Sequence, residues 1–287
     1  MTIEVVEFIQ SLRTGFGDSF FNLISFLGEE YVYIFVLSIV YYALDKRLGE
    51  ILGFSLFVTG IINAVLKSLI GAMRPFEKYP DRIVNLRPDT AGGYSFPSGH
   101  TQLFTTFTFT AAFRKQSRLL LWAAIVLSVL MAISRMYLGV HFLEDVAVSL
   151  ILGVAIAYGM HHLFGQLTDK AKFKLYWITV AVGAVFLFTR YEDFYKTYGL
   201  LVGFVGGMQI EQRRIQFTLD VVWWKKVIRV AGGLILMIAI MVGLGAAFDT
   251  LATEGTDWMN ILDFVRYGLI SFIGLGVYPF LFRRFHF

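Results

Sequence analysis

The sequence contains no cysteine and carries little charge. The lack of cysteine excludes disulfide bonds, thiolate catalysis and cysteine-ligated zinc. Charged residues make up 16% of the 287-residue chain and hydrophobic residues 57%, so a water-soluble domain would have too little polar surface to cover itself. The net charge of +4 is small, and its spread along the chain argues against nucleic-acid binding. The composition therefore predicts a polytopic membrane protein.

In place of charge, the chain has long hydrophobic runs and many aromatic residues. Phe (29), Tyr (14) and Trp (5) are abundant, as expected where side chains face lipid or lie in the interfacial belts of a bilayer. A membrane span needs ~20 apolar residues, and somewhat fewer where flanking residues reach the interface. We therefore predict an all-α polytopic membrane helical bundle of about nine spans. They cover residues 30–44, 51–70, 98–113, 119–137, 143–165, 175–189, 197–210, 227–248 and 264–282.

The N-terminus differs from the rest because it is acidic and amphipathic, unlike the basic start of a cleavable signal peptide. Ile3, Val6 and Ile9 recur at helical spacing with Glu4 and Glu7 between them, a pattern typical of a helix that lies in the membrane interface. A first span in this segment is the alternative. We divide the chain into an N-terminal amphipathic segment at residues 1–28, a catalytic core at residues 29–165 and additional spans of unassigned role at residues 166–287.

Basic residues concentrate in alternate connections between the predicted spans, which by the positive-inside rule are cytoplasmic. The remaining connections, at residues 76–96, 138–142, 190–196 and 249–263, then lie outside. Three polar clusters, described next, fall on that outer side. The expected location is a multi-pass membrane protein, in the plasma membrane if it is bacterial, with these clusters on the extracytoplasmic side. The basic connections contain Lys46, Arg47, Arg114, Lys115, Arg118, Lys170, Lys172, Lys174, Arg213, Arg214, Lys225, Lys226, Arg229, Arg283 and Arg284.

The first cluster is Lys67 with Arg74 and Pro75. Lys67 falls in the last turn of a predicted span, and Gly71 and Pro75 should end that helix, since the residue before proline favours an extended backbone. Arg74 would then fold back towards Lys67. The plainer interpretation is two cations that reach from a helix end to the membrane surface.

The second cluster is the run Pro97-Ser98-Gly99-His100, where a glycine-containing loop turns into an apolar helix. Ser98 is expected to cap the helix, and Gly99 has no side chain to block the first free backbone N–H groups, so an anion can approach the positive end of the helix dipole. This pattern is typical of a phosphate cradle, with His100 beside it. The plainer interpretation is an ordinary capped helix start.

The third cluster comprises Ser134-Arg135, His141 and Asp145. Asp145 follows His141 by four residues, so on a helix the carboxylate would reach the imidazole. A carboxylate on one ring nitrogen fixes the tautomer and leaves the other nitrogen free to attack. Glu144 is an alternative partner, and a purely structural His/Asp contact is the plainer interpretation.

Together, in this order and spacing, the three clusters resemble the signature of the type 2 phosphatidic acid phosphatase superfamily, which includes lipid phosphate phosphatases and glucose-6-phosphatases. The resemblance covers roughly residues 30–165. It implies that His141 is a nucleophile that forms a phosphohistidine, that Asp145 orients it, and that His100 is the general acid and later the base. The phosphoryl oxygens would be held by Lys67, Arg74, Ser98, Gly99 and Arg135.

We therefore expect a metal-independent phosphoric monoester or diphosphate hydrolase with no cofactor. The expected substrate is a lipid phosphate or diphosphate of the isoprenoid diphosphate, phosphatidate or phosphatidylglycerol phosphate type, bound at the outer membrane face, with membrane lipids as the other partners and no nucleic acid. A soluble sugar phosphate is the alternative, because the spans after residue 165 are similar to those of glucose-6-phosphatases. An anion transporter is less favoured, since the polar residues gather at one face. The sequence gives no oligomeric state.

Overall fold

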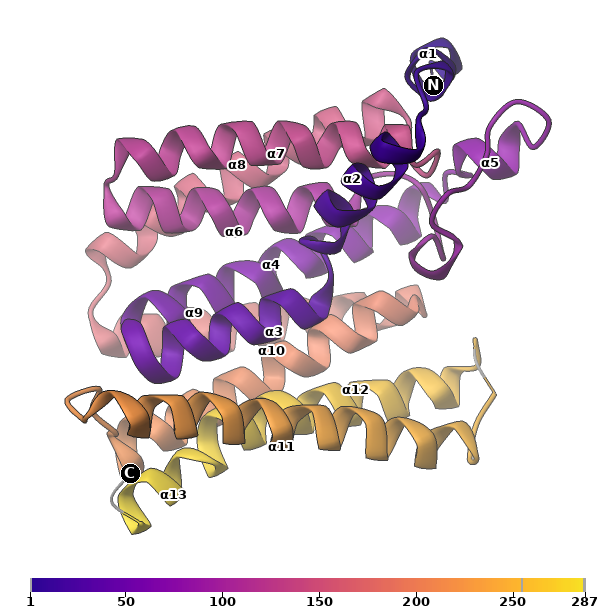
Figure 1. The fold of residues 1–287 in the computed structure, drawn as a ribbon. Coiled ribbons are helices and arrows are strands. Elements are labelled where there is room, and N and C mark those ends of the chain that lie inside the picture. The colour runs from indigo at the N-terminus through magenta and orange to yellow at the C-terminus, as the bar shows by residue number, and fades with distance from the viewer. Residues whose placement is uncertain (1, 254, 286–287) are drawn as a thin grey trace. The chain divides into compact units, whose positions relative to one another are not determined.

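The computed structural model describes residues 2–253 and 255–285, and within them every regular element is a helix. This confirms the predicted all-α class. The chain forms two compact units, Met1–Tyr33 with Ile62–Leu163, and Ile34–Ile61 with Phe164–Phe287. The three predicted polar clusters all belong to the first unit. Figure 1 shows the course of the chain.

The first unit is built from helices that run side by side. Within it, α6 and α7 form an antiparallel pair, joined at Gln116, whose backbone is left-handed (φ 49°), and at Ser117, which caps α7 by accepting a bond from Leu120 N. The elements of this unit are α1 (Ile3–Ser11), α2 (Gly15–Phe26), the start of α3 (Glu30–Ile39), the end of α4 (Lys46–Ile70), α5 (Pro75–Lys78), a 3₁₀ turn (Pro88–Thr90), α6 (Gly99–Lys115), α7 (Arg118–Tyr137) and most of α8 (Leu143–Gln166).

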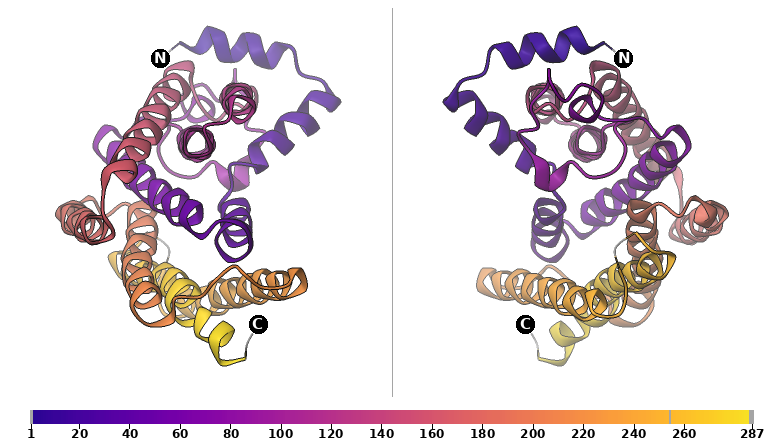
Figure 2. Two further views of the ribbon diagram at one scale, coloured as in Figure 1. Left: turned by 90° about the vertical axis from the view of Figure 1, so that its left-hand side faces the viewer. Right: turned by 90° about the vertical axis from the view of Figure 1, so that its right-hand side faces the viewer.

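The N-terminal helix α1 is amphipathic, as its sequence pattern predicts. Its apolar residues Ile3 and Val6 are buried in a cluster with Ile83 and Phe142, so this face of the helix is covered by protein. Gln10 fastens the helix by donating through Nε2 to a backbone carbonyl of the connection before α6 and to another at the end of α7. Helices α1 and α2, drawn in indigo, lie beside the end of α7 (Figure 2).

The second unit is held together by close packing of α10 on α12. A side chain on Gly203 would place its Cβ 2.1 Å from the Gly268 carbonyl oxygen, so the two backbones touch there. Small residues allow such close approach between membrane helices. The elements of this unit are the end of α3, a π-helical turn (Val40–Leu44), the start of α4, α9 (Asp169–Ala184), a 3₁₀ segment (Val185–Thr189), α10 (Glu192–Ile210), π-helical turns (Glu211–Ile215 and Ile273–Val277), α11 (Trp223–Asp249), α12 (Asp257–Phe272) and α13 (Pro279–Arg284).

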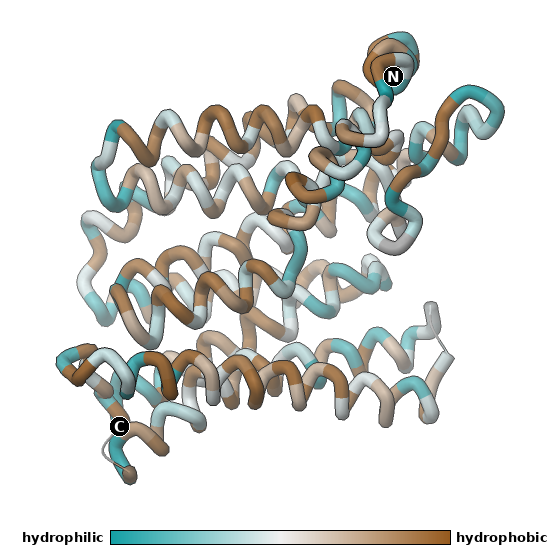
Figure 3. The backbone as a smooth tube through the Cα atoms, viewed as in Figure 1, coloured by the Kyte–Doolittle hydropathy of each residue, from teal (hydrophilic) through white to brown (hydrophobic). Residues whose placement is uncertain are grey.

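Several helices are long and apolar enough to cross a bilayer. Across the described residues there are six, and a seventh if the bent pair of segments Gly15–Phe26 and Glu30–Leu44 counts as one span. Hydrophobic residues run along α11, and hydrophilic residues gather at turns and helix ends (Figure 3). The chain is therefore a helical membrane bundle, while the count of nine spans stays a prediction. The six helical segments are Lys46–Lys78, Arg118–Tyr137, Leu143–Gln166, Asp169–Thr189, Trp223–Asp249 and Asp257–Arg284.

Candidate active site

The predicted site residues lie at one end of the helices of the first unit. Each comes where a helix begins or ends, and most are almost fully buried. The predicted helix break is confirmed: α4 stops at Ile70, Gly71 adopts a left-handed backbone (φ 61°), and α5 begins at Pro75. The buried members of the set are Lys67, Arg74, Ser98, Arg135, His141 and Asp145.

Arg74 joins the first cluster to the third. Its Nη1 atom lies 3.3 Å from His141 Nε2 and donates a hydrogen bond of 3.0 Å to the carbonyl oxygen of Val140. The side chain is only 3% exposed, so it is not a cation reaching out to the membrane surface. The plainer interpretation of this cluster therefore does not apply to Arg74.

The glycine-containing loop before α6 holds both cations of the first cluster. Arg74 donates through Nε to the Gly93 carbonyl oxygen (2.9 Å) and through Nη2 to that of Gly92 (2.6 Å), while Lys67 Nζ donates to the carbonyl oxygen of Tyr94. Gly93 has a left-handed backbone (φ 66°), which turns these carbonyl groups towards the cations. The loop thus holds two positive side chains through its backbone carbonyl oxygens.

Ser98 stands at the N-cap position of α6, but its side chain makes no capping bond. The predicted side-chain cap is wrong, because the Ser98 hydroxyl pairs with the Thr101 hydroxyl at 3.0 Å. The backbone of Ser98 ties this cluster to the third one instead: its N–H donates to the Asp145 carbonyl oxygen (3.3 Å), and its carbonyl oxygen accepts from Ser149 Oγ (3.0 Å). The helix start is therefore held against α8.

Arg135 is fully buried in the last turn of α7. Its Nη1 atom donates to Ser25 Oγ, whereas its Nε and Nη2 atoms have no hydrogen-bond partner among the described residues. His100 Nε2, also buried, has none there either. Buried polar nitrogen atoms are nearly always paired, and the N–H groups of Arg135 would suit the oxygens of an anion.

Ser95 enters the site between His141 and Asp145. The His141 Nδ1 and Asp145 Oδ2 atoms are 3.4 Å apart, at the long end for a hydrogen bond. The Ser95 hydroxyl donates to the same oxygen at 2.5 Å and lies 3.4 Å from His141 Nδ1, and the Phe142 N–H donates to that oxygen at 2.8 Å. Sequence reasoning missed Ser95, because a serine in a glycine-containing loop carries no local signal of this role.

Glu144, the alternative partner for His141, is engaged elsewhere. One of its carboxylate oxygens accepts bonds from the backbone N–H (2.8 Å) and the hydroxyl (2.9 Å) of Thr2. The carboxylate beside the imidazole is therefore that of Asp145.

His141 lies in the connection between α7 and α8, surrounded by cations. Burial lowers the pKa of His141 well below its usual value, and the charges of Arg74, Arg135 and Lys67, with a smaller contribution from His100, lower it further. These groups come from all three clusters. The two imidazoles and the three cations are therefore close enough for the charges to influence the pKa of His141. The lowered pKa keeps the imidazole neutral, the form that can act as a nucleophile.

This shift predicts a loss of stability in acid. Above pH ~6.5 the His141 ring is neutral in the folded and unfolded chains alike. Below that pH, His141 takes up a proton in the unfolded chain but not yet in the folded one. The free energy of unfolding therefore falls by up to ~1.4 kcal/mol per pH unit until the pKa of the folded state is reached. Thermal unfolding in detergent at about pH 7.5 and pH 5 should therefore show a smaller acid loss for His141→Gln than for the wild type. An acid loss equal in both proteins would contradict the shift, and His162→Gln, at an exposed site, is the control.

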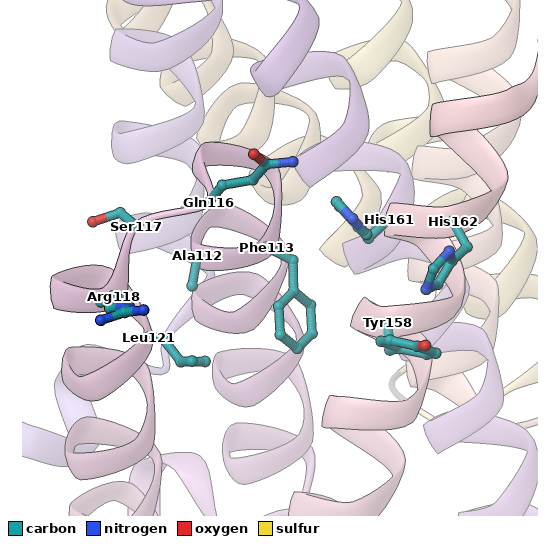
Figure 4. A pocket seen from close by; sticks show the side chains of 9 residues that line it. All are labelled: Ala112, Phe113, Gln116, Ser117, Arg118, Leu121, Tyr158, His161 and His162. Atoms are coloured by element: carbon teal, nitrogen blue, oxygen red, sulfur yellow. The ribbon is translucent and has the colours of Figure 1, made fainter.

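A separate pocket of about 290 Å³ lies at the other end of the same helices, between the turn that joins α6 to α7 and the late part of α8. Figure 4 shows that it contains no predicted site residue. Its lining is mainly apolar. The lining residues are Ala112, Phe113, Gln116, Ser117, Arg118, Leu121, Tyr158, His161 and His162.

Two parts of the chain match known protein families. Residues 49–169 match the PAP2 superfamily, and residues 195–287 match the transmembrane extension of PAP2 superfamily phosphatases. The bacitracin transport permease protein BcrC of Bacillus licheniformis is 33% identical over 164 residues, which are 55% of this chain and 77% of that protein. The chain belongs to the PAP2 superfamily. It is a multi-pass membrane phosphatase, and all eight predicted site residues fall inside the PAP2 match.

Two further PAP2-like relatives match over shorter lengths. The undecaprenyl-diphosphatase of Sulfolobus acidocaldarius is 30% identical over 134 residues, which are 46% of this chain and 63% of that protein. The decaprenylphosphoryl-5-phosphoribose phosphatase of Mycobacterium tuberculosis is 37% identical over 116 residues, which are 40% of this chain and 61% of that protein.

Proposed function

We propose that this membrane phosphatase hydrolyses a lipid phosphate or diphosphate at the extracytoplasmic face through a phosphohistidine on His141. The observation that carries the proposal is the position of His141: Nε2 lies beside Arg74, and Nδ1 faces Asp145 and Ser95. With a proton on Nδ1, the ring directs the lone pair of Nε2 to the side where the cations gather.

In the first step, Nε2 of His141 attacks phosphorus, an N–P bond forms and the bond from phosphorus to the leaving oxygen breaks. His100 gives a proton to that oxygen. In the second step, His100 takes a proton from water as the water oxygen attacks phosphorus, the N–P bond breaks and inorganic phosphate leaves. Asp145 and Ser95 hold the Nδ1 side of the ring and stabilise the positive charge that develops on it.

Charge neutralisation comes from the protein itself in this scheme. Phosphoryl transfer depends on positioning and on stabilising charge over the equatorial oxygens. Lys67, Arg74 and Arg135 would supply three fixed cations, joined by the Gly99 N–H and the Ser98 hydroxyl at the start of α6. We therefore propose a reaction that needs no metal ion.

A lipid is favoured over a soluble sugar phosphate by two observations. The predicted site residues are buried within a membrane helical unit, so a substrate whose tail stays in lipid would reach them from the side. Two of the relatives carry names that refer to polyprenyl lipids. Within the lipid class, we propose a polyprenyl diphosphate or monophosphate.

The test is phosphate release by the purified protein in detergent with excess EDTA. The substrates are undecaprenyl diphosphate, phosphatidate, phosphatidylglycerol phosphate and glucose 6-phosphate. We expect kcat/KM to be highest for undecaprenyl diphosphate and activity to be inhibited by orthovanadate. Preference for glucose 6-phosphate would replace the lipid proposal with the sugar-phosphate one, and loss of all activity in EDTA would overturn the metal-free scheme.

The proposed side of the membrane can be tested with single cysteines, because the chain contains none. Asp81 is exposed in the connection before α6, close in sequence to the site, and Gln116 is exposed at the other end of α6. In intact cells, a membrane-impermeant maleimide should label Asp81→Cys but not Gln116→Cys, and both should react after the cells are lysed. The reverse pattern would place the site in the cytoplasm.

A further inference from the structure

The N-terminal segment ends against the predicted catalytic groups. Ser25, in the last turn of α2, is fully buried, and its hydroxyl oxygen accepts the bond from Arg135 Nη1. The two residues are 110 positions apart in sequence. Because this bond is the one hydrogen bond that the Arg135 side chain makes among the described residues, it fixes the direction in which the remaining guanidinium N–H groups point.

Gly28 lies against the other proposed catalytic group, His100. A side chain on Gly28 would place its Cβ 2.9 Å from His100 Cδ2, 3.2 Å from His100 Cβ and 3.1 Å from Met131 Cε. The absence of a side chain on Gly28 therefore allows the imidazole to occupy its observed position. Its φ is not in the left-handed region, so this requirement for glycine is steric.

The segment that carries both residues is fastened on two sides. Near its start, the hydroxyl of Tyr137, from the end of α7, donates to Asp18 Oδ1 at 2.8 Å. Further along, Arg87 forms an ion pair with Glu29 and donates to the carbonyl oxygen (3.1 Å) and the side-chain oxygen (2.9 Å) of Asn22. These contacts hold the end of α2 between α7 and the loop before α6.

We propose that Ser25 and Gly28 are positioning residues of the active site: Ser25 aims the guanidinium of Arg135 at the phosphoryl group, and Gly28 sets the place of His100. The inference rests on the proposed function. Both residues lie outside residues 49–169, the part of the chain that matches the PAP2 superfamily, and outside the three polar clusters. The N-terminal segment would then help to position the catalytic side chains as well as packing against this unit.

Ser25→Ala removes the hydroxyl that holds Arg135. We expect kcat to fall ~10-fold, in line with the loss of a bond to a charged group, while KM changes little because Lys67 and Arg74 still bind the phosphate. The inhibition constant of orthovanadate should rise by a similar factor. The control is Ser19→Ala, on the same helix but exposed, which should leave all three constants within twofold of the wild type.

A second pair of variants covers the case in which Ser25→Ala does not fold. Ser25→Thr keeps the hydroxyl and Ser25→Val replaces it with a methyl group of similar shape, so both carry the same extra bulk. We expect the threonine variant to have at least ~5-fold higher kcat than the valine variant, with similar melting temperatures. Equal kcat in this pair, or equal kcat in Ser25→Ala and Ser19→Ala, would overturn the role of Ser25.

Gly28→Ala tests the second half of the proposal. We expect kcat to fall ~10-fold or more and the pH profile of kcat to change, since the displaced group is the proposed acid and base. Gly15→Ala is the matched control, because a Cβ there meets nothing within 4 Å. An unchanged kcat and pH profile in Gly28→Ala would overturn its role. If the wild type releases no phosphate from any substrate, the proposed function fails; an active wild type with unaffected variants refutes this inference alone.

Discussion

Replacing His141 with alanine should lower kcat/KM for phosphate release by ~10⁴-fold or more. The size of the loss follows from the role of the imidazole as the atom that bonds to phosphorus: without it, water must attack directly, and the remaining cations only position the substrate. The other proposed catalytic imidazole, His100, stands at the start of α6 and is already assigned to proton transfer. The measurement is release of inorganic phosphate by purified protein.

The trapped intermediate separates this role from a merely structural one. Wild-type protein mixed briefly with ³²P-labelled substrate and quenched in alkali should carry label that is stable to base and lost in acid, as expected for phosphohistidine. His141→Ala should carry none, while His100→Ala should retain its label for longer, because His100 is the proposed base for the second step. His162→Ala, at an exposed position on α8, is the control. Activity of His141→Ala within tenfold of the wild type would exclude the phosphohistidine route.

The sequence was sufficient to predict where the charged groups of the site lie. Lys67, Arg74 and Arg135 stand where long apolar runs end, and charges in such runs need a polar pocket. Gly71 and Pro75 were enough to place the break after α4, because both act on the local backbone. Asp145 does lie beside His141 as predicted, but not through a shared helix, because α8 begins only at Leu143 and His141 precedes it in the connection.

The hydroxyl groups of the site could not be predicted in this way. Ser95 bonds to Asp145 across 50 residues and Ser25 to Arg135 across 110, so each pair is set by tertiary packing. Ser98 shows the converse: its sequence position predicts a cap, but the nearby hydroxyl of Thr101 competes for its side chain. A serine hydroxyl can donate or accept a hydrogen bond and rotates to suit its partner, so the local sequence says little about which partner it has.

Arg135→Lys should lower kcat by ~10²- to 10³-fold although the positive charge is kept. A guanidinium presents N–H groups in a fixed plane that match two phosphoryl oxygens at once, whereas an ammonium is a single point of charge on a flexible chain. The lysine also loses the planar fork with which Arg135 can bind Ser25 and an anion simultaneously. Arg118→Lys, at the exposed first residue of the same helix, should leave kcat unchanged. A loss below tenfold in Arg135→Lys would remove Arg135 from the proposed phosphate site.

Arg135→Met should abolish activity and yet stabilise the folded protein without substrate. Arg135 is fully buried, forms no ion pair among the described residues and leaves two of its nitrogen atoms unpaired, so the fold buries a cation that no described carboxylate contacts directly. Replacing a buried charge with an apolar side chain of similar length is often stabilising, here by ~1 kcal/mol or more. The melting temperature in detergent should rise by about 2 °C or more, and orthovanadate should raise the melting temperature of Arg135→Met less than that of the wild type. A melting temperature below that of the wild type would mean that Arg135 stabilises the fold rather than binding the phosphate. A residue kept for binding can lower the stability of the folded protein, whereas a structural residue raises it.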